Sequence, residues 1–100
     1  MILVRDIFQV KFGKAKDAIG LWKQGVALNK KMGFKSTRLL TDLAGPNYYT
    51  LVLETTMESL SEFETRGKSG MSDPEWQSLY ARIVDVTESG RREIFNIVAE

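Results

Sequence analysis

The chain has 100 residues, which is about one domain, and we expect residues 1–100 to form a single one. Hydrophobic residues make up 43% of the sequence and aromatic residues 10%, as is typical of a globular protein with one core. Fourteen basic and thirteen acidic residues leave a net charge of +1. No basic stripe stands out, so we expect no nucleic-acid partner.

The sequence contains neither cysteine nor histidine. These absences exclude disulfides, zinc–thiolate sites, a Ser-His-Asp triad and a histidine-ligated haem, so we expect no metal site and no cofactor. The first residues, "MILVRDIF", are apolar for only four positions before Arg5. They resemble neither a signal peptide nor a membrane span, and we expect a cytoplasmic protein without a membrane segment.

Residues 1–12 alternate with a period of two, which predicts a strand that Gly13 ends. Its apolar even positions are Ile2, Val4, Phe8, Val10 and Phe12, and only Asp6 interrupts them. Residues 14–32 change to a period of three to four, which predicts an amphipathic helix. Gly33 follows as a C-terminal cap.

Two further strands are predicted over residues 34–43 and 48–55. The turn signal Gly45-Pro46-Asn47 separates them, which favours an antiparallel hairpin. Residues 59–66 then predict a short helix, and we expect the run Gly67-Lys68-Ser69-Gly70 to break it.

The stretch "SDPEWQSLYARI" predicts the start of another helix. Either Ser72 or Asp73 serves as N-cap, and with Asp73 in that role Pro74 falls at the first helical position. Its apolar stripe consists of Trp76, Leu79, Tyr80, Ile83 and Thr87, and Glu88-Ser89-Gly90 is expected to stop the helix.

Residues 91–98 predict a fourth strand. The order is then β-α-β-β-α-β, with the second helical region broken in two. This order predicts a ferredoxin-like α+β domain with a four-stranded antiparallel sheet and helices on one side.

Both faces of this predicted sheet carry apolar residues. In the third strand Leu51 and Leu53 face one way and Val52 the other, and the last strand has apolar groups on both sides. Helices cover only one face of the sheet. At about 25 cal/mol per Å², burying the apolar side chains of the other face against a second surface would stabilise the protein by several kcal/mol. We therefore expect a homodimer formed by sheet-to-sheet packing.

Five short pieces of the sequence carry a resemblance to a known family. They are "VKFGK" (10–14), "LW" (21–22), "GPN" (45–47), "ESLSEFE" (58–64) and "DPEWQ" (73–77). Together they span nearly the whole chain, which resembles the NIPSNAP-like proteins of the dimeric α/β-barrel superfamily, a group that also contains the antibiotic-biosynthesis monooxygenases.

The resemblance implies a homodimer whose two sheets form a barrel, with a pocket for a small apolar molecule between each sheet and its helices. Family members often have a histidine in the third strand and an arginine in the following helix. Here the strand reads Leu51-Val52-Leu53, and Phe63 stands near the arginine position. A catalytic role that depends on those groups is therefore not implied for this chain.

Three aromatic residues are candidates for lining the pocket. Trp22 and Trp76 are expected on the inward faces of two helices, with Tyr80 one turn beyond Trp76. Such aromatics either line a cleft for a planar ligand or fill the core, and the sequence leaves both readings open.

Three strand residues complete the candidate set. Asp6 interrupts an apolar strand face, Arg38 lies on the second strand, and Tyr49 lies at the start of the third. Asp6 and Arg38 are either a polar pair in a cleft or dimer interface, or residues at exposed strand edges.

Two functions are compatible with these features. The first is a non-catalytic homodimeric domain that binds a small apolar or aromatic molecule between sheet and helices, or acts as an interaction module. The alternative is a cofactor-independent monooxygenase acting on an activated aromatic such as a hydroquinone. It needs a polar group beside an apolar pocket, and Tyr80, Arg38 and Asp6 are the candidates.

Overall fold

The computed structural model describes residues 1–34 and 36–100, so Lys35, which falls in the second predicted strand, lies outside the described residues. Within these residues the elements are β1 (Ile2–Val10), α1 (Ala15–Lys31), β2 (Ser36–Thr41), β3 (Thr50–Met57), α2 (Leu60–Met71), α3 (Pro74–Asp85) and β4 (Thr87–Asn96). The described strands form one antiparallel sheet in the order β2-β3-β1-β4. The predicted ferredoxin-like α+β fold, with its divided second helical region, is confirmed.

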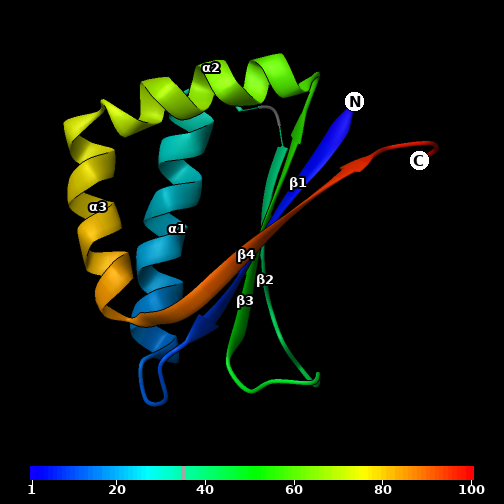
Figure 1. Cartoon of the computed structure of the whole chain (residues 1–100). Helices are drawn as coiled ribbons and strands as arrows, with labels where there is room; N and C mark the ends of the chain where they lie inside the picture. Colours follow the sequence, from blue (N-terminus) through cyan, green and yellow to red (C-terminus); the bar gives the residue numbers. More distant parts are fainter. Residues whose placement is uncertain (35) are drawn as a thin grey trace.

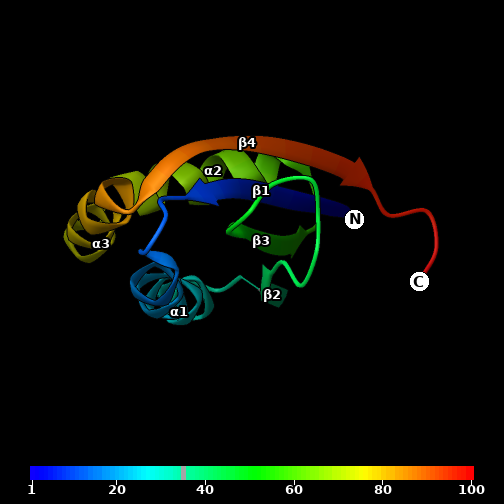
Figure 2. The ribbon, with the colours of Figure 1, turned by 90° about the horizontal axis from the view of Figure 1, so that it is seen from below.

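The helices lie together on one side of the sheet (Figure 1). Figure 2 shows the strands in the order β4, β1, β3, β2, with α1 and α3 on the same side of them. The C-terminal end leaves the sheet on the opposite side in both views. Each helix among the described residues is too short or too polar to span a lipid bilayer.

Side-chain caps fix where two of the helices begin. Asp73 caps α3 by accepting a hydrogen bond from the backbone N–H of Glu75 at 2.9 Å, and Pro74 occupies the first turn as predicted. Ser59 caps α2 by accepting from the N–H of Glu62 at 3.2 Å. In α1, Asp17 in the first turn and lysines in the last complement the helix dipole.

Three predicted boundaries are wrong. Helix α2 continues through 67–70, so the glycine-rich run does not break it. Strand β3 begins at Thr50, which leaves Tyr48 and Tyr49 in the preceding loop. Strand β4 begins at Thr87 rather than at residue 91. A Cβ on Gly90 would lie 2.8 Å from the Phe8 ring, so this glycine permits a close strand contact instead of stopping a helix.

The two faces of the sheet differ in character. The helix face takes its β1 residues from the even positions, since Phe8 stacks on Trp22 of α1 and Val10 packs against α1. The outer face takes the odd positions of β1 and the β3 residues opposite them, among which are Ile7 with Val52 and Arg5 with Glu54. This outer face is more polar than predicted, because charged residues cross its middle.

The core lies between the helix face and the helices, in two clusters. The larger cluster comprises Val10, Ala18, Trp22, Leu28, Leu51, Leu53, Leu79, Ile83 and Val86. The smaller cluster comprises Ile2, Val4 and Met57, with Phe34 and Phe63 packed against it. Asp6 lies on β1 between the two.

Two glycines of α1 give a matched test of this packing. A Cβ on Gly25 would lie 3.1 Å from Trp22 and 3.3 Å from Trp76, whereas a Cβ on Gly20 would meet no atom within 4 Å. We expect Gly20→Ala to stabilise the protein by up to about 1 kcal/mol through helix propensity alone. Gly25→Ala should not show this gain in stability, because the added Cβ would press on the buried Trp22 ring. Thermal melts of both variants check this, and equal stabilisation would contradict the packing.

Candidate functional site

Trp22 packs inside the core. Its side chain is 4% exposed, its ring stacks on Phe8 at a centroid distance of 4.9 Å, and it meets Trp76 edge-on at 6.2 Å. Among the described residues, the buried indole N–H has no hydrogen-bond partner. Of the two readings that the sequence left open, these contacts favour core packing for Trp22.

The third helical candidate, Tyr80, does not join the two tryptophans. Trp76 is half-buried against Trp22, but Tyr80 is 56% exposed on α3. The predicted apolar stripe of α3 therefore holds at Trp76, Leu79 and Ile83. It fails at Tyr80, which is exposed, and at Thr87, which lies in β4.

The two polar candidates lie on opposite faces of the sheet, so they form no pair. Asp6 lies on the helix face and accepts a 2.5 Å hydrogen bond from Nε of Arg92, whose guanidinium lies 4.9 Å from the centre of the Phe63 ring. Arg38 lies on the outer face and binds Glu54 of β3.

Glu54 is the most buried charged residue of the described chain. Its side chain is 5% exposed, one carboxylate oxygen accepts from Nε of Arg5 at 2.9 Å, and the other accepts from Arg38. Burial by itself raises the pKa of this carboxyl group. The hydrogen bonds from Arg38 and Arg5 and their positive charges outweigh burial, so the pKa of Glu54 lies below its ordinary value.

Tyr49 borders a hollow of about 190 Å³ between the first turns of α1 and the end of the sheet. The hollow is lined by Val10, Ala15, Ile19, Thr41, Asp42, Tyr49, Thr50 and Leu51. Tyr49 has φ = 56°, a left-handed conformation that is rare for an aromatic residue and stores backbone strain. Its carbonyl accepts from the N–H of Val10 at 2.9 Å, which holds it beside β1.

The lining of this hollow is apolar at its base and polar at its edge. Leu51 and Val10 belong to the larger core cluster, and Ile19 packs against it. At the edge, the Asp42 carboxylate accepts from the N–H of Thr50 at 2.9 Å. An engineered apolar cavity of about 150 Å³ is known to hold benzene, so a hollow of this size suits a molecule with one ring.

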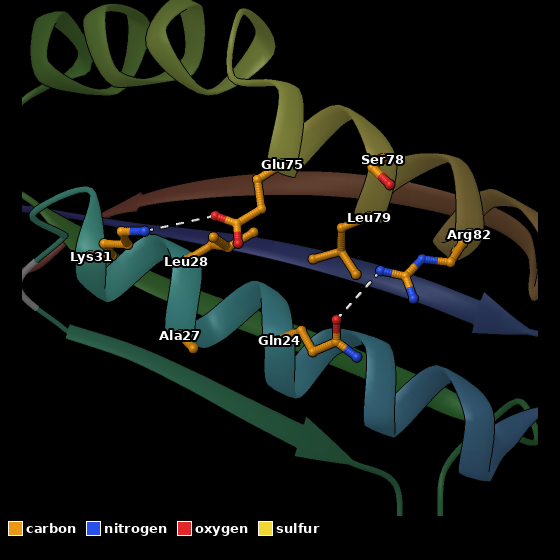
Figure 3. Close-up of a pocket in the computed structure, with 8 residues that line it drawn as sticks. All are labelled: Gln24, Ala27, Leu28, Lys31, Glu75, Ser78, Leu79 and Arg82. Carbon is orange, nitrogen blue, oxygen red and sulfur yellow. Dashed lines mark hydrogen bonds and ion pairs between the residues drawn. The ribbon is translucent and has the colours of Figure 1, made fainter.

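A second, larger cleft of about 440 Å³ lies between α1 and α3 (Figure 3). Its apolar lining residues are Ala27, Leu28 and Leu79. Exposed side chains cross it at both ends, where Lys31 lies 3.9 Å from Glu75 and Arg82 lies 3.5 Å from Gln24. Figure 3 shows these pairs reaching from one helix to the other, so the cleft is a groove between two helices and does not lie between sheet and helices.

Neither the hollow nor the role of Glu54 was predicted from the sequence. The lining of the hollow comes from four separate segments of the chain, and no local sequence pattern joins them. The sequence does contain a signal for Glu54. It lies two positions after Val52, so the two side chains share one face of the strand, and a charged residue there needs a partner. No group of three acidic side chains in the described part of the chain is placed to hold a metal ion.

The sequence matches no model of a known protein family and no curated protein. Several solved structures, however, are similar in fold to this chain. A NIPSNAP family protein from Agrobacterium tumefaciens superposes with a TM-score of 0.85 at 21% identity, over 95% of this chain and 90% of that one. An uncharacterised NIPSNAP domain protein from Burkholderia xenovorans gives 0.84 at 18% identity, over 99% and 96% of the two chains. The chain therefore has the NIPSNAP fold.

The NIPSNAP fold is shared with a group of oxygenases. SnoaB, a cofactor-independent oxygenase from Streptomyces nogalater, superposes with a TM-score of 0.76 at 12% identity, over 99% of this chain and 94% of that one. The resemblance inferred from the sequence is thus confirmed for the fold. A shared fold at this identity carries no activity with it.

Proposed function

We propose that this chain is a homodimeric domain that binds a small, mostly apolar molecule with one ring in the hollow beside Tyr49. The observation that carries the ligand proposal is the hollow itself, which lies between α1 and the sheet, has a base continuous with the core and has Asp42 and Thr50 at its edge. The strained Tyr49 supports it, because such strain tends to gather at binding sites.

The dimer proposal rests on the outer face of the sheet, which none of the described helices covers. Four strands about 4.8 Å apart and about eight residues long give a face of about 500 Å². Two such faces bury about 1,000 Å² in total, the lower limit for a specific interface. Leu40 and Phe95 on this face are 37% and 45% exposed, which is area that a second copy would cover.

Two variants of α1 test where a ligand binds. Ile19→Trp fills the hollow, whereas Ala27→Trp fills the cleft between α1 and α3 and serves as the matched control. Single-ring phenols and hydroquinones are screened against wild type by thermal shift and NMR titration. We expect binding that Ile19→Trp weakens at least tenfold and Ala27→Trp leaves unchanged. Loss in Ala27→Trp alone, or no binding by wild type, would overturn the ligand proposal.

The alternative function, a cofactor-independent monooxygenase, is favoured only by the structural similarity to oxygenases such as SnoaB. Its three candidate groups do not converge, because Arg38 lies on the outer face, Asp6 is bound by Arg92 and Tyr80 is exposed. Oxygen uptake with hydroquinones at a rate above the protein-free control would favour this alternative, and a rate equal to that control would exclude it for these substrates.

A further inference from the structure

An exposed group of aromatic rings adjoins the hollow beside Tyr49. Phe12, in the loop between β1 and α1, meets the Tyr49 ring edge-on at a centroid distance of 5.0 Å and the Tyr48 ring at 6.2 Å. Phe12 and Tyr48 are 71% and 78% exposed, and Tyr49 belongs both to this group and to the lining of the hollow. We call these three residues the aromatic cluster.

The lining of the hollow carries a single charge. Asp42 is the only charged residue among the eight that line it. One oxygen of its carboxylate accepts from the N–H of Thr50, and within the described ranges no lysine or arginine forms an ion pair with it. The hollow therefore presents one negative charge beside an apolar base.

The aromatic cluster also lacks a cation of the protein's own. Among the described residues, arginines lie over three other rings, with the guanidinium 4.9–5.4 Å from the ring centre: Phe34, Phe63 and Phe95. In the same part of the chain, no ring of the aromatic cluster has such a partner. The face of an aromatic ring carries partial negative charge, so the cluster and Asp42 both favour a positively charged ligand.

The start of α1 acts in the opposite direction but more weakly. Ala15 belongs to the lining, and a helix N-terminus carries roughly half a positive charge. Asp17 in the same turn offsets that charge. Lys14 and Lys16 flank Ala15, but both are exposed and outside the lining, so solvent screens them. The full charge of Asp42 therefore sets the sign at the edge of the hollow.

We propose that the hollow takes an arylalkylamine, with its ring against Val10, Ile19 and Leu51 and its ammonium group at the edge, between Asp42 and the aromatic cluster. This inference rests on the proposed ligand site and adds the chemical class of its ligand. The ammonium group donates a charge-assisted hydrogen bond to the Asp42 carboxylate, and the neighbouring rings stabilise its charge.

Three probes of similar shape and different charge test this class. Phenethylamine is cationic, phenethyl alcohol is neutral and phenylacetate is anionic. In NMR titrations of the wild type we expect the amine to bind about tenfold more tightly than the alcohol, and phenylacetate to bind most weakly. Equal binding of amine and alcohol, or tighter binding of phenylacetate, would overturn the amine proposal and leave the proposed ligand site standing. If none of the three bound, the ligand site itself would be refuted.

Three variants then locate the preference for the amine. Asp42→Asn removes the charge but keeps an oxygen that can accept from Thr50, so the affinity for the amine should fall to that for the alcohol. Phe12→Leu keeps apolar bulk without the ring and should weaken the amine alone, by about threefold. Asp17→Asn makes the same change in net charge outside the lining and should leave the preference intact.

An amine preference that survives in Asp42→Asn would contradict the proposal. So would an equal loss in Asp17→Asn, because the preference would then come from net charge and not from the site. Circular dichroism confirms that each variant is folded.

Discussion

Trp22→Ala is expected to lower the free energy of unfolding by about 3–5 kcal/mol. The substitution removes a 4% exposed ring that stacks on Phe8 and meets Trp76, and it leaves a cavity in the larger core cluster. Chemical denaturation monitored by far-UV circular dichroism measures the loss. A loss of this size would mean that Trp22 mainly holds helix α1 on the sheet.

Tyr80→Ala is the control for this prediction, because Tyr80 was placed in the same candidate site but is 56% exposed. Its expected effect is within about 0.5 kcal/mol. If both variants lost a similar amount of stability, the assignment of Trp22 to the core would be contradicted.

Glu54→Gln is expected to lower the free energy of unfolding by about 2 kcal/mol at neutral pH. The substitution leaves Arg5 and Arg38 beside a neutral amide that cannot accept from both as a carboxylate does. Breaking a fully buried pair would cost more, but the arginines are 35% and 67% exposed and water compensates part of the loss. Glu75→Gln, in an exposed pair with a 3.9 Å contact to Lys31, should change stability by less than about 0.5 kcal/mol.

Acidic pH should remove the contribution of Glu54 to the free energy of unfolding. Because its pKa is lower in the folded chain than in the unfolded one, its stabilisation is complete above the unfolded value of about 4.3 and is lost as the pH falls through the folded value. The stability difference between wild type and Glu54→Gln should therefore be constant from pH 7 to 5 and shrink below about pH 4. Denaturation midpoints from pH 7 to 3 check this, and a difference that grows in acid would contradict the lowered pKa.

Local signals predicted the parts of the fold that depend on neighbouring residues. The Asp73-Pro74 start of α3 was predicted because an N-cap and a first-turn proline act within one turn of helix. The change from period two to period three or four located β1 and α1, because each element buries one face.

Features that depend on distant partners were not predictable in this way. From the sequence alone, Gly90 was predicted to end a helix. Strand pairing places it instead in β4 against Phe8 of β1. Tyr48 and Tyr49 were predicted to lie in a strand because tyrosine favours strands. Tyr49 instead has a positive φ and lies in the loop before β3. The ion pairs of Glu54 with Arg5 and Arg38 were not predictable for the same reason, since these residues lie on three strands and only their register brings them together.

The proposed homodimer requires a second copy that covers the outer face of the sheet. Sedimentation equilibrium of the wild-type protein between about 1 and 100 μM measures this directly, because an interface of about 1,000 Å² should give a dimer that dissociates on dilution. We predict a mass twice that of the 11.3 kDa chain at the upper concentrations. A mass of 11.3 kDa over the whole range would contradict the proposed homodimer.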